Sequence, residues 1–261
     1  MKALHIAATG MSAQQMRVDT ISNNLANMST SGYNARRAEF ADLHYQQFAR
    51  AGSINAADGT VLPTGIQLGL GVRPAAVSMQ IQQGALAQTN GDLDVAIEGK
   101  GFLSVTLPDG QAAYTRDGAL KRSGDGLIVN SEGFEVAPGI VIPNDARSIS
   151  INADGEVYGY FIGQVQPQLL GQLTLTGFAN EKGLEAMGSN LFLETEASGP
   201  GFEAAPGTDG LGTLRQGYLE ESSVDPVREM TELIKAQRGY ELNSKVITAV
   251  DQMMGATTQV R

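Results

Sequence analysis

The sequence predicts an α+β fold. Two long terminal α-helices pack together in a coiled-coil-like domain and flank a mainly antiparallel β body, with an extended β or irregular arm between. Apolar residues recur every seven positions near both ends of the 261-residue chain. In the middle, short β-forming runs alternate with Asp-Gly pairs, which are strong hairpin signals. The 32 glycines agree with a body that is rich in tight turns.

The N-terminal helix is predicted from a repeat with two positions per heptad. Leu4, Met11, Val18 and Leu25 occupy the first position, and Ala7, Gln14, Ile21 and Met28 lie three residues later. Such a seam packs against a second helix, although Ala7 and Gln14 weaken it. We assign residues 1–33 and 222–261 to one helical assembly domain.

Three asparagines lie at the end of this helix, in the stretch SNNLANMSTSGY. Asparagine disfavours helix interiors because its amide competes for backbone hydrogen bonds. In a helix buried among copies, Asn23, Asn24 and Asn27 would penalise wrong registers, with Asn243 as a partner. Replacing Asn24 or Asn27 with leucine should then disorder assembly and spare the body. Gly32 is expected to end the helix.

Residues 34–74 are predicted to form an extended linker or arm. The segment 46–74 has low charge and no helical period. A stretch of this length without regular structure is uncommon in a compact domain and is usually functional.

The β-rich body is assigned to residues 75–221. Turns are expected at Asp117-Gly118, Asp125-Gly126 and Glu132-Gly133, because both central residues of such pairs tolerate a positive φ. Further Asp-Gly pairs begin at Asp58, Asp109, Asp154 and Asp209.

The C-terminal helix is predicted to begin at Pro226, with Asp225 as its N-cap. Its seam has two positions per heptad: Leu233, Tyr240, Ile247 and Met254, with Ala236, Asn243 and Val250 three residues later. A second stripe comprises Leu242, Val246, Ala249 and Met253. This apolar surface is wider than one partner helix needs, so several neighbours are expected, in the chain or from other copies.

Charge and hydropathy exclude several classes of protein. Residues 38–219 carry nine bases and twenty acids, whereas residues 1–37 carry four bases and one acid. This is the reverse of a nucleic-acid binder, so no nucleic-acid partner is expected. No apolar run is long enough to span a membrane. The first ten residues are read as mature sequence, because His5, Thr9 and Gly10 interrupt any signal-peptide core.

No catalytic, cofactor-binding or metal site is expected. The chain has two histidines and no cysteine, and its Asp-Gly pairs match no calcium-loop pattern. The acidic pairs Asp92/Asp94 and Glu220/Glu221 are interpreted as solvated rather than catalytic. Helices that expose apolar stripes instead favour self-assembly, and a head-to-tail interface that does not close produces a helical filament or tube.

Three motifs resemble the bacterial flagellar rod and hook family. SNNLANMSTSGY is similar to the N-terminal signature of that family, and EMTELIKAQRGYELNSKVI to its C-terminal one. GFLSV with AYTRDGAL resembles the shared body segment. The order and spacing also match, and the likeness covers the chain end to end. Gly239 departs from the alanine that is common in the family and costs about 1 kcal/mol of helix propensity.

The resemblance implies a rigid tubular rod that transmits torque across the periplasm. The length, the arm and the run LPTGIQLGLGVRPAAV favour a subunit of the distal rod. The alternatives are a proximal rod subunit and, in another class, a cell-wall hydrolase that acts in rod assembly. Implied partners are further copies in a helical polymer, other rod proteins, hook and hook-base proteins, the surrounding P- and L-ring proteins, and the flagellar export apparatus.

The residues expected to mediate assembly lie on both helices. They are Leu4, Met11, Val18, Ile21, Asn23, Asn24, Leu25, Asn27, Gly32, Leu233, Gln237, Arg238, Tyr240, Asn243, Ile247 and Val250. The residues expected to characterise the arm are Leu62, Pro63, Gly65, Gly69 and Gly71.

Overall fold

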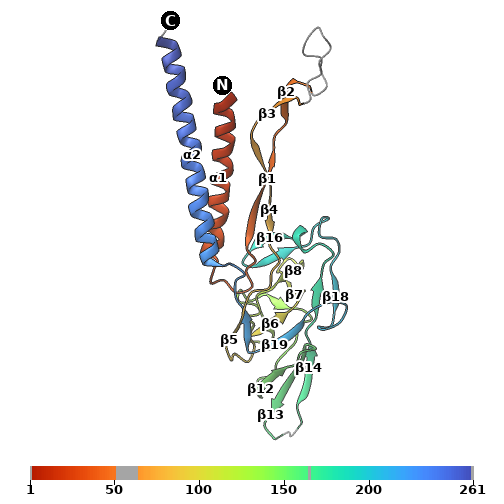
Figure 1. Cartoon of the computed structure of the whole chain (residues 1–261). Helices are drawn as coiled ribbons and strands as arrows, with labels where there is room; N and C mark the ends of the chain where they lie inside the picture. Colours follow the sequence, from red (N-terminus) through yellow and green to blue (C-terminus); the bar gives the residue numbers. More distant parts are fainter. Residues whose placement is uncertain (1, 51–63, 164–165, 260–261) are drawn as a thin grey trace. The chain divides into compact units, whose positions relative to one another are not determined.

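The computed structural model describes residues 2–50, 64–163 and 166–259 (Figure 1). The chain forms two compact units. The first unit comprises Met1–Leu25, Arg36–Ser78 and Pro226–Arg261, and the second comprises Ala26–Ala35 and Met79–Asp225. The predicted α+β class is confirmed, since two long helices pack together in the first unit and the second unit is built mostly from antiparallel strands.

The helices are α1 (Lys2–Ala26) and α2 (Pro226–Gln259). Helix α2 begins at the expected proline. The expectation that Gly32 ends the first helix is wrong, because α1 ends six residues earlier and Asn27 starts a turn. The Thr30 amide donates to the Asn27 carbonyl, and the Thr30 hydroxyl lies 3.2 Å from Asn27 Oδ1. Met28 therefore lies beyond the seam and is 48% exposed.

The described part of the arm is a β ribbon, which is the extended β alternative of the prediction. Strand β1 (Arg36–Asp42) pairs with β4 (Val72–Met79). Strand β2 (Tyr45–Ala49) pairs antiparallel with β3 (Ile66–Gly69). Leu62 and Pro63 lie outside the described residues.

The second unit contains sixteen further described strands and one short 3-10 helix. Their bounds are β5 (Leu86–Gln88), β6 (Val95–Glu98), β7 (Phe102–Thr106), β8 (Ala112–Thr115), β9 (Lys121–Arg122), β10 (Ile128–Val129), β11 (Glu135–Val136), β12 (Ala146–Ile151), β13 (Glu156–Phe161), β14 (Gln168–Gln172), β15 (Leu175–Gly177), η1 (Glu181–Gly183), β16 (Glu185–Gly188), β17 (Leu191–Leu193), β18 (Phe202–Ala204), β19 (Thr213–Gln216) and β20 (Tyr218–Glu220).

Strands that are distant in sequence are neighbours in these sheets. The main path runs β16-β17-β8-β7-β11-β10-β9, and β15 joins it through β7. A three-stranded sheet has the order β12-β13-β14, and two further pairs are β19-β6 and β20-β5. The described strand pairs of this unit are antiparallel, as the turn-rich sequence predicts.

Most of the predicted hairpins are present. Asp109-Gly110, Asp125-Gly126, Glu132-Gly133 and Asp154-Gly155 each connect two strands that pair with one another. The prediction for Asp117-Gly118 is wrong, because β8 and β9, which flank it, pair with other strands. Gly118 is needed there for a different reason, since a Cβ would lie 1.6 Å from the Val95 carbonyl oxygen.

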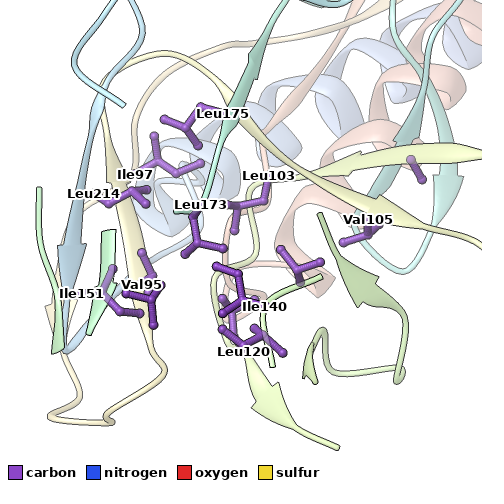
Figure 2. Close-up of a cluster of buried hydrophobic side chains, with 14 of the residues drawn as sticks. Val95, Ile97, Leu103, Val105, Leu120, Ile140, Ile151, Leu173, Leu175 and Leu214 are labelled. Atoms are coloured by element: carbon purple, nitrogen blue, oxygen red, sulfur yellow. The ribbon is translucent and has the colours of Figure 1, made fainter. Parts of the chain in front are cut away.

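Branched aliphatic side chains from these sheets form the main core of the second unit (Figure 2). Val95, Ile97, Leu103 and Leu175 are completely buried in it. A smaller cluster of aromatic rings lies around Phe102, whose ring meets Phe178 and Phe192 edge to face at centroid distances of 6.0 and 5.9 Å. A core of this kind gives the body a fixed structure of its own.

Candidate assembly surface

Helices α1 and α2 run antiparallel, side by side (Figure 1). Asn24 of α1 reaches Glu229 of α2, and a Cβ on Gly10 would lie 2.9 Å from Asn243 Nδ2. Asn24 and Gly10 lie fourteen residues apart on α1, and their neighbours Glu229 and Asn243 lie fourteen residues apart on α2. The two helices therefore keep one register between these contacts. In this register Asn243 lies beside Gly10 and does not meet Asn24 or Asn27. Its pairing with them between copies stays a prediction.

Three of the buried side chains on the two helices are alanines. Ala7, Ala13 and Ile21 are buried on α1, and Ala236 is fully buried on α2. Most of the other predicted seam residues are half-buried: Leu4, Met11, Val18, Leu25, Leu233, Asn243, Ile247 and Val250. Met254, also predicted on the seam, is 42% exposed. Tyr240 was predicted on the seam but is 44% exposed. Most heptad positions therefore fall on the buried and half-buried faces of the two helices.

Gln14 and Gly239 meet across this contact. A Cβ on Gly239 would lie 3.1 Å from Gln14 Cδ, which is tighter than an ordinary contact. Gly239 therefore lies where the two helices of one chain approach each other closely. Gln14 Oε1 is buried without a hydrogen-bond partner among the described residues. A buried carbonyl oxygen without a partner costs about 1–3 kcal/mol.

Replacing Gln14 with leucine should therefore stabilise the helix pair. Leucine has a similar size, removes the unpaired oxygen and adds apolar area to the seam, for a gain of about 1–2 kcal/mol. The measurement is hydrogen exchange of the α1 amides, which should slow. Gln15→Leu is the control, because Gln15 is exposed and leucine there should give no added protection. Equal responses from both variants would contradict this explanation.

Asn24 joins α1 to the first strand of the ribbon. Its Nδ2 donates to the Arg36 carbonyl at 2.8 Å, and its Oδ1 accepts the Arg36 amide at 2.9 Å. The same Nδ2 lies 3.3 Å from Glu229 Oε2, and Asn24 is 1% exposed. A buried amide with paired donors and acceptors fixes local geometry. The role of Asn24 inside the chain is thus a clamp between α1, β1 and α2.

The β ribbon also contacts α1 closer to the N-terminus of the helix. Gly71 has a φ of +120°, and a Cβ there would lie 2.3 Å from Thr9 Oγ1. The Val72 amide donates to the same oxygen at 3.4 Å. Lys2 hydrogen-bonds Gln46 and lies over the Phe48 ring. Of the predicted arm residues, Gly71 thus has a clear reason to be glycine; neither Thr9 nor Lys2 was singled out by the sequence pattern.

A long apolar stripe on α2 lies outside the contact with α1. Its described members, separated by three, four, seven or eight positions, are Val227, Met230, Ile234, Leu242, Val246 and Met253, with exposed fractions from 46% to 75%. It includes Leu242, Val246 and Met253 of the predicted second stripe and extends toward the start of the helix; Ala249, the fourth predicted member, is also exposed. Among the predicted assembly residues, Gln237 and Arg238 are also exposed. An exposed apolar stripe of this kind is a candidate surface for contact with another protein.

Ionic contacts flank the helix pair. Arg17 of α1 forms an ion pair with Glu232 of α2, and Lys235 donates to the same carboxylate at 2.8 Å. The Lys235 hydrogen bond, with added attraction from Arg17, lowers the pKa of Glu232 below its ordinary value. These groups are solvated, so they contribute to register more than to stability.

In the second unit, the interpretation of Glu220 as a solvated carboxylate is wrong. Glu220 is 3% exposed and forms a buried ion pair with Arg116, at 2.9 Å between Nη2 and Oε2. The partner lies 104 positions away in the sequence, so no local pattern signals it. Gly32 lies beside this pair, with a φ of +66° and its amide donating to the Glu220 carbonyl at 2.8 Å.

Asp117 follows Arg116 and is half-buried. Burial raises the pKa of its carboxyl group, repulsion from Asp94 adds to this, and the Ala119 amide and Lys121 oppose it. The folded pKa thus lies above the unfolded value, so the charged form destabilises the fold. The penalty is absent below the unfolded pKa and is fully present once the pH exceeds the folded one.

Asp117→Asn should therefore raise the melting temperature at pH 7, and the gain should vanish as the pH falls below about 4. Asparagine keeps the oxygen that accepts the Ala119 amide at 3.1 Å. Asp109→Asn is the matched control, because exposed Asp109 accepts the Gln111 amide in the same way. A gain that persists unchanged at low pH would contradict the role of charge.

No grouping of the described residues points to catalysis or metal binding. No cluster of three or more His, Cys, Asp or Glu side chains with metal-site geometry occurs among them. None of the described helices is long and apolar enough to cross a membrane. The apolar stripe of α2 remains the longest run of exposed apolar side chains on the described part of the two helices.

Three protein families match the chain. They are described as flagella basal body rod protein (residues 4–34), flagellar hook protein FlgE/F/G D1 domain (96–159) and flagellar basal body rod FlgEFG protein C-terminal (215–260).

Curated relatives match over the full length. The chain is 52% identical to the flagellar basal-body rod protein FlgG of Caulobacter vibrioides, over 100% of both chains. It is 47% identical to FlgG of Buchnera aphidicola subsp. Acyrthosiphon pisum, over 99% of both. It is 36% identical to FlgG of Bacillus subtilis, over 97% of both.

Proposed function

Because this chain belongs to the family of flagellar basal-body rod proteins FlgG, we propose that it is a structural subunit of the flagellar distal rod. Its copies polymerise into a rigid helical tube that transmits torque from the motor across the periplasm to the hook. The subunit performs no catalysis of its own.

The observation that carries this proposal is the exposed apolar stripe of α2. In a single chain, Ile234 and Leu242 are 58% and 63% exposed. Fully burying one such side chain contributes about 1.5–3 kcal/mol. A second copy is the occupant that we propose, since a rod subunit is surrounded by copies of itself. A helical polymer repeats the same small contact many times, so modest contacts sum to a stiff tube.

The predicted assembly residues fall into two groups under this proposal. Asn24 and the half-buried seam residues hold the helix pair in a fixed shape that a neighbour can recognise. Gln237 and Arg238 are exposed on α2 and contact the neighbouring copy, as does Tyr240, which is 44% exposed at a seam position. Other rod proteins, hook and hook-base proteins and the P- and L-ring proteins are the further partners, and the flagellar export apparatus delivers the chain.

Electron microscopy of the concentrated full-length protein tests the proposal. Straight tubes or fibres are expected; a protein that stays monomeric at every concentration and with every nucleating rod protein would contradict it.

Deleting residues 46–66 separates the distal rod from a proximal, FlgF-like subunit. The deletion should change filament stiffness or curvature in a distal rod subunit, and unchanged straight filaments would favour the proximal alternative.

The hydrolase alternative has a direct test. Purified protein incubated with peptidoglycan should release no soluble fragments. Release that disappears when one carboxylate is replaced would overturn the structural role.

A further inference from the structure

Three separate stretches of chain meet within the second unit. The first is Ala26–Ala35, the second begins at Met79, and the third ends at Asp225. These stretches are where the chain passes from one unit to the other. All three converge on the buried Arg116–Glu220 ion pair, and every contact in the argument below lies inside the second unit.

The ion pair is deeply buried and well paired. The side chains of Arg116 and Glu220 are 4% and 3% exposed. Arg116 Nε donates to Glu220 Oε2 at 2.9 Å, and Nη2 lies 2.9 Å from the same oxygen in the ion pair. Nη1 donates to the Gly101 carbonyl at 3.1 Å, and Nη2 also donates to the Gly99 carbonyl at 3.0 Å. A guanidinium held in this way is fixed in position and cannot follow a displaced carboxylate.

Glu220 carries contacts to two of the stretches at once. Its Oε1 accepts the Gly84 amide at 3.0 Å, and its backbone carbonyl accepts the Gly32 amide at 2.8 Å. Two residues later, the Ser222–Val224 turn continues the same attachment. The Ser223 amide donates to the Tyr33 carbonyl at 3.0 Å, and Ser223 Oγ accepts the Ala35 amide at 2.9 Å.

The first and second stretches also bond to each other. The Gln80 amide donates to the Ala35 carbonyl at 2.7 Å. Gly84 fits so closely that a Cβ would lie 1.9 Å from the Glu221 carbonyl oxygen. Each stretch is therefore held by both of the others, and Arg116 supplies the charge that keeps Glu220 in place.

We propose that the Arg116–Glu220 ion pair is a cooperative latch: residues 30–35, 80–85 and 220–224 open and close as one unit when the pair breaks or forms. Independent loops would each open at their own rate. Here the loss of Glu220 from its site removes an acceptor from Gly32 and Gly84 together. The latch belongs to the single chain, so it stands or falls separately from the proposed role in a rod.

Hydrogen exchange of the full-length chain, read by mass spectrometry, tests the latch. Glu220→Gln keeps the shape and removes the charge, which leaves buried Arg116 without its counter-ion. Exchange should rise by about tenfold or more in all three segments, and peptides covering residues 126–142 should keep their protection. Glu156→Gln is the control, because Glu156 is a half-buried carboxylate of the same unit that accepts from Asn152 and Tyr158. It should leave the three segments unchanged.

Ser223→Ala keeps the proposal testable if Glu220→Gln does not fold. It removes the acceptor of the Ala35 amide and leaves the ion pair intact. In a cooperative latch, exchange should also rise in residues 80–85, by about threefold. A rise confined to residues 30–35 would mean that the segments open independently and would overturn the proposal. An equal rise over the whole body with Glu220→Gln would overturn it as well, since the ion pair would then stabilise the fold without coupling these segments.

Discussion

Replacing Leu242 and Val246 together with glutamate should abolish assembly of the protein into filaments and leave its body folded. Both side chains are exposed on α2, by 63% and 46%, so the change costs the single chain little. In a polymer they would be buried, each contributing about 1.5–3 kcal/mol, and two desolvated carboxylates would add a larger penalty. Sedimentation and electron microscopy report the loss, and thermal unfolding reports the intact body.

Ser244→Glu/Thr248→Glu is the matched control. These positions are exposed on the same turns of α2 and have the same spacing, so the variant adds the same charge outside the stripe. It should still form filaments. If both double variants fail to assemble, the added charge is responsible rather than the stripe. If Leu242→Glu/Val246→Glu assembles normally, the stripe is not an interface.

Gly32→Ala should destabilise the second unit by about 2–4 kcal/mol. The glycine has a φ of +66°, which disfavours alanine. A Cβ there would lie 2.8 Å from the Arg116 carbonyl carbon and 2.9 Å from the Asp117 amide nitrogen. Both are backbone atoms that cannot move aside, so the turn would have to leave its site. Chemical denaturation monitored by circular dichroism measures the change.

Gly110→Ala separates the cost of the positive φ from the cost of the close contact with the backbone at Arg116. Gly110 has a φ of +84° and nothing within 4 Å of the position of a Cβ. Alanine there meets only the backbone strain, about 1–2 kcal/mol. The difference between the losses of stability in Gly32→Ala and Gly110→Ala is the cost of the close approach at Arg116. Equal losses would show that the backbone conformation alone explains why position 32 holds glycine.

Local sequence patterns correctly predicted the structural elements that are determined by a few neighbouring residues. Pro226 marks the start of α2 because its fixed φ suits the first helical turn. Asp125-Gly126 and Asp154-Gly155 indicate hairpins because two residues are enough to reverse a strand. The heptads located the faces on which α1 and α2 meet. In each case the information lies within a few neighbouring residues.

Features that depend on distant residues could not be predicted in this way. Asp117-Gly118 has the composition of a hairpin turn, but Gly118 is required by the Val95 carbonyl. Glu220 beside Glu221 has the composition of a solvated pair, and only the fold shows Arg116 as its partner. The position of Asn24 in the sequence predicted a residue that sets the register between copies. In the structure its side chain hydrogen-bonds the Arg36 backbone of the same chain. Tertiary contacts decided all three.

The strand order of the second unit has a consequence for how fast the protein folds. Phe192 pairs with Tyr114, Leu175 with Leu103, and Leu214 with Ile97. Forming such a pair closes a long loop, and the chain loses conformational entropy before the contact stabilises it. A fold dominated by such pairs therefore forms in milliseconds to seconds rather than microseconds. A newly made chain therefore spends an appreciable time without its sheets, and a chain in that state can still be threaded through a channel too narrow for the finished body.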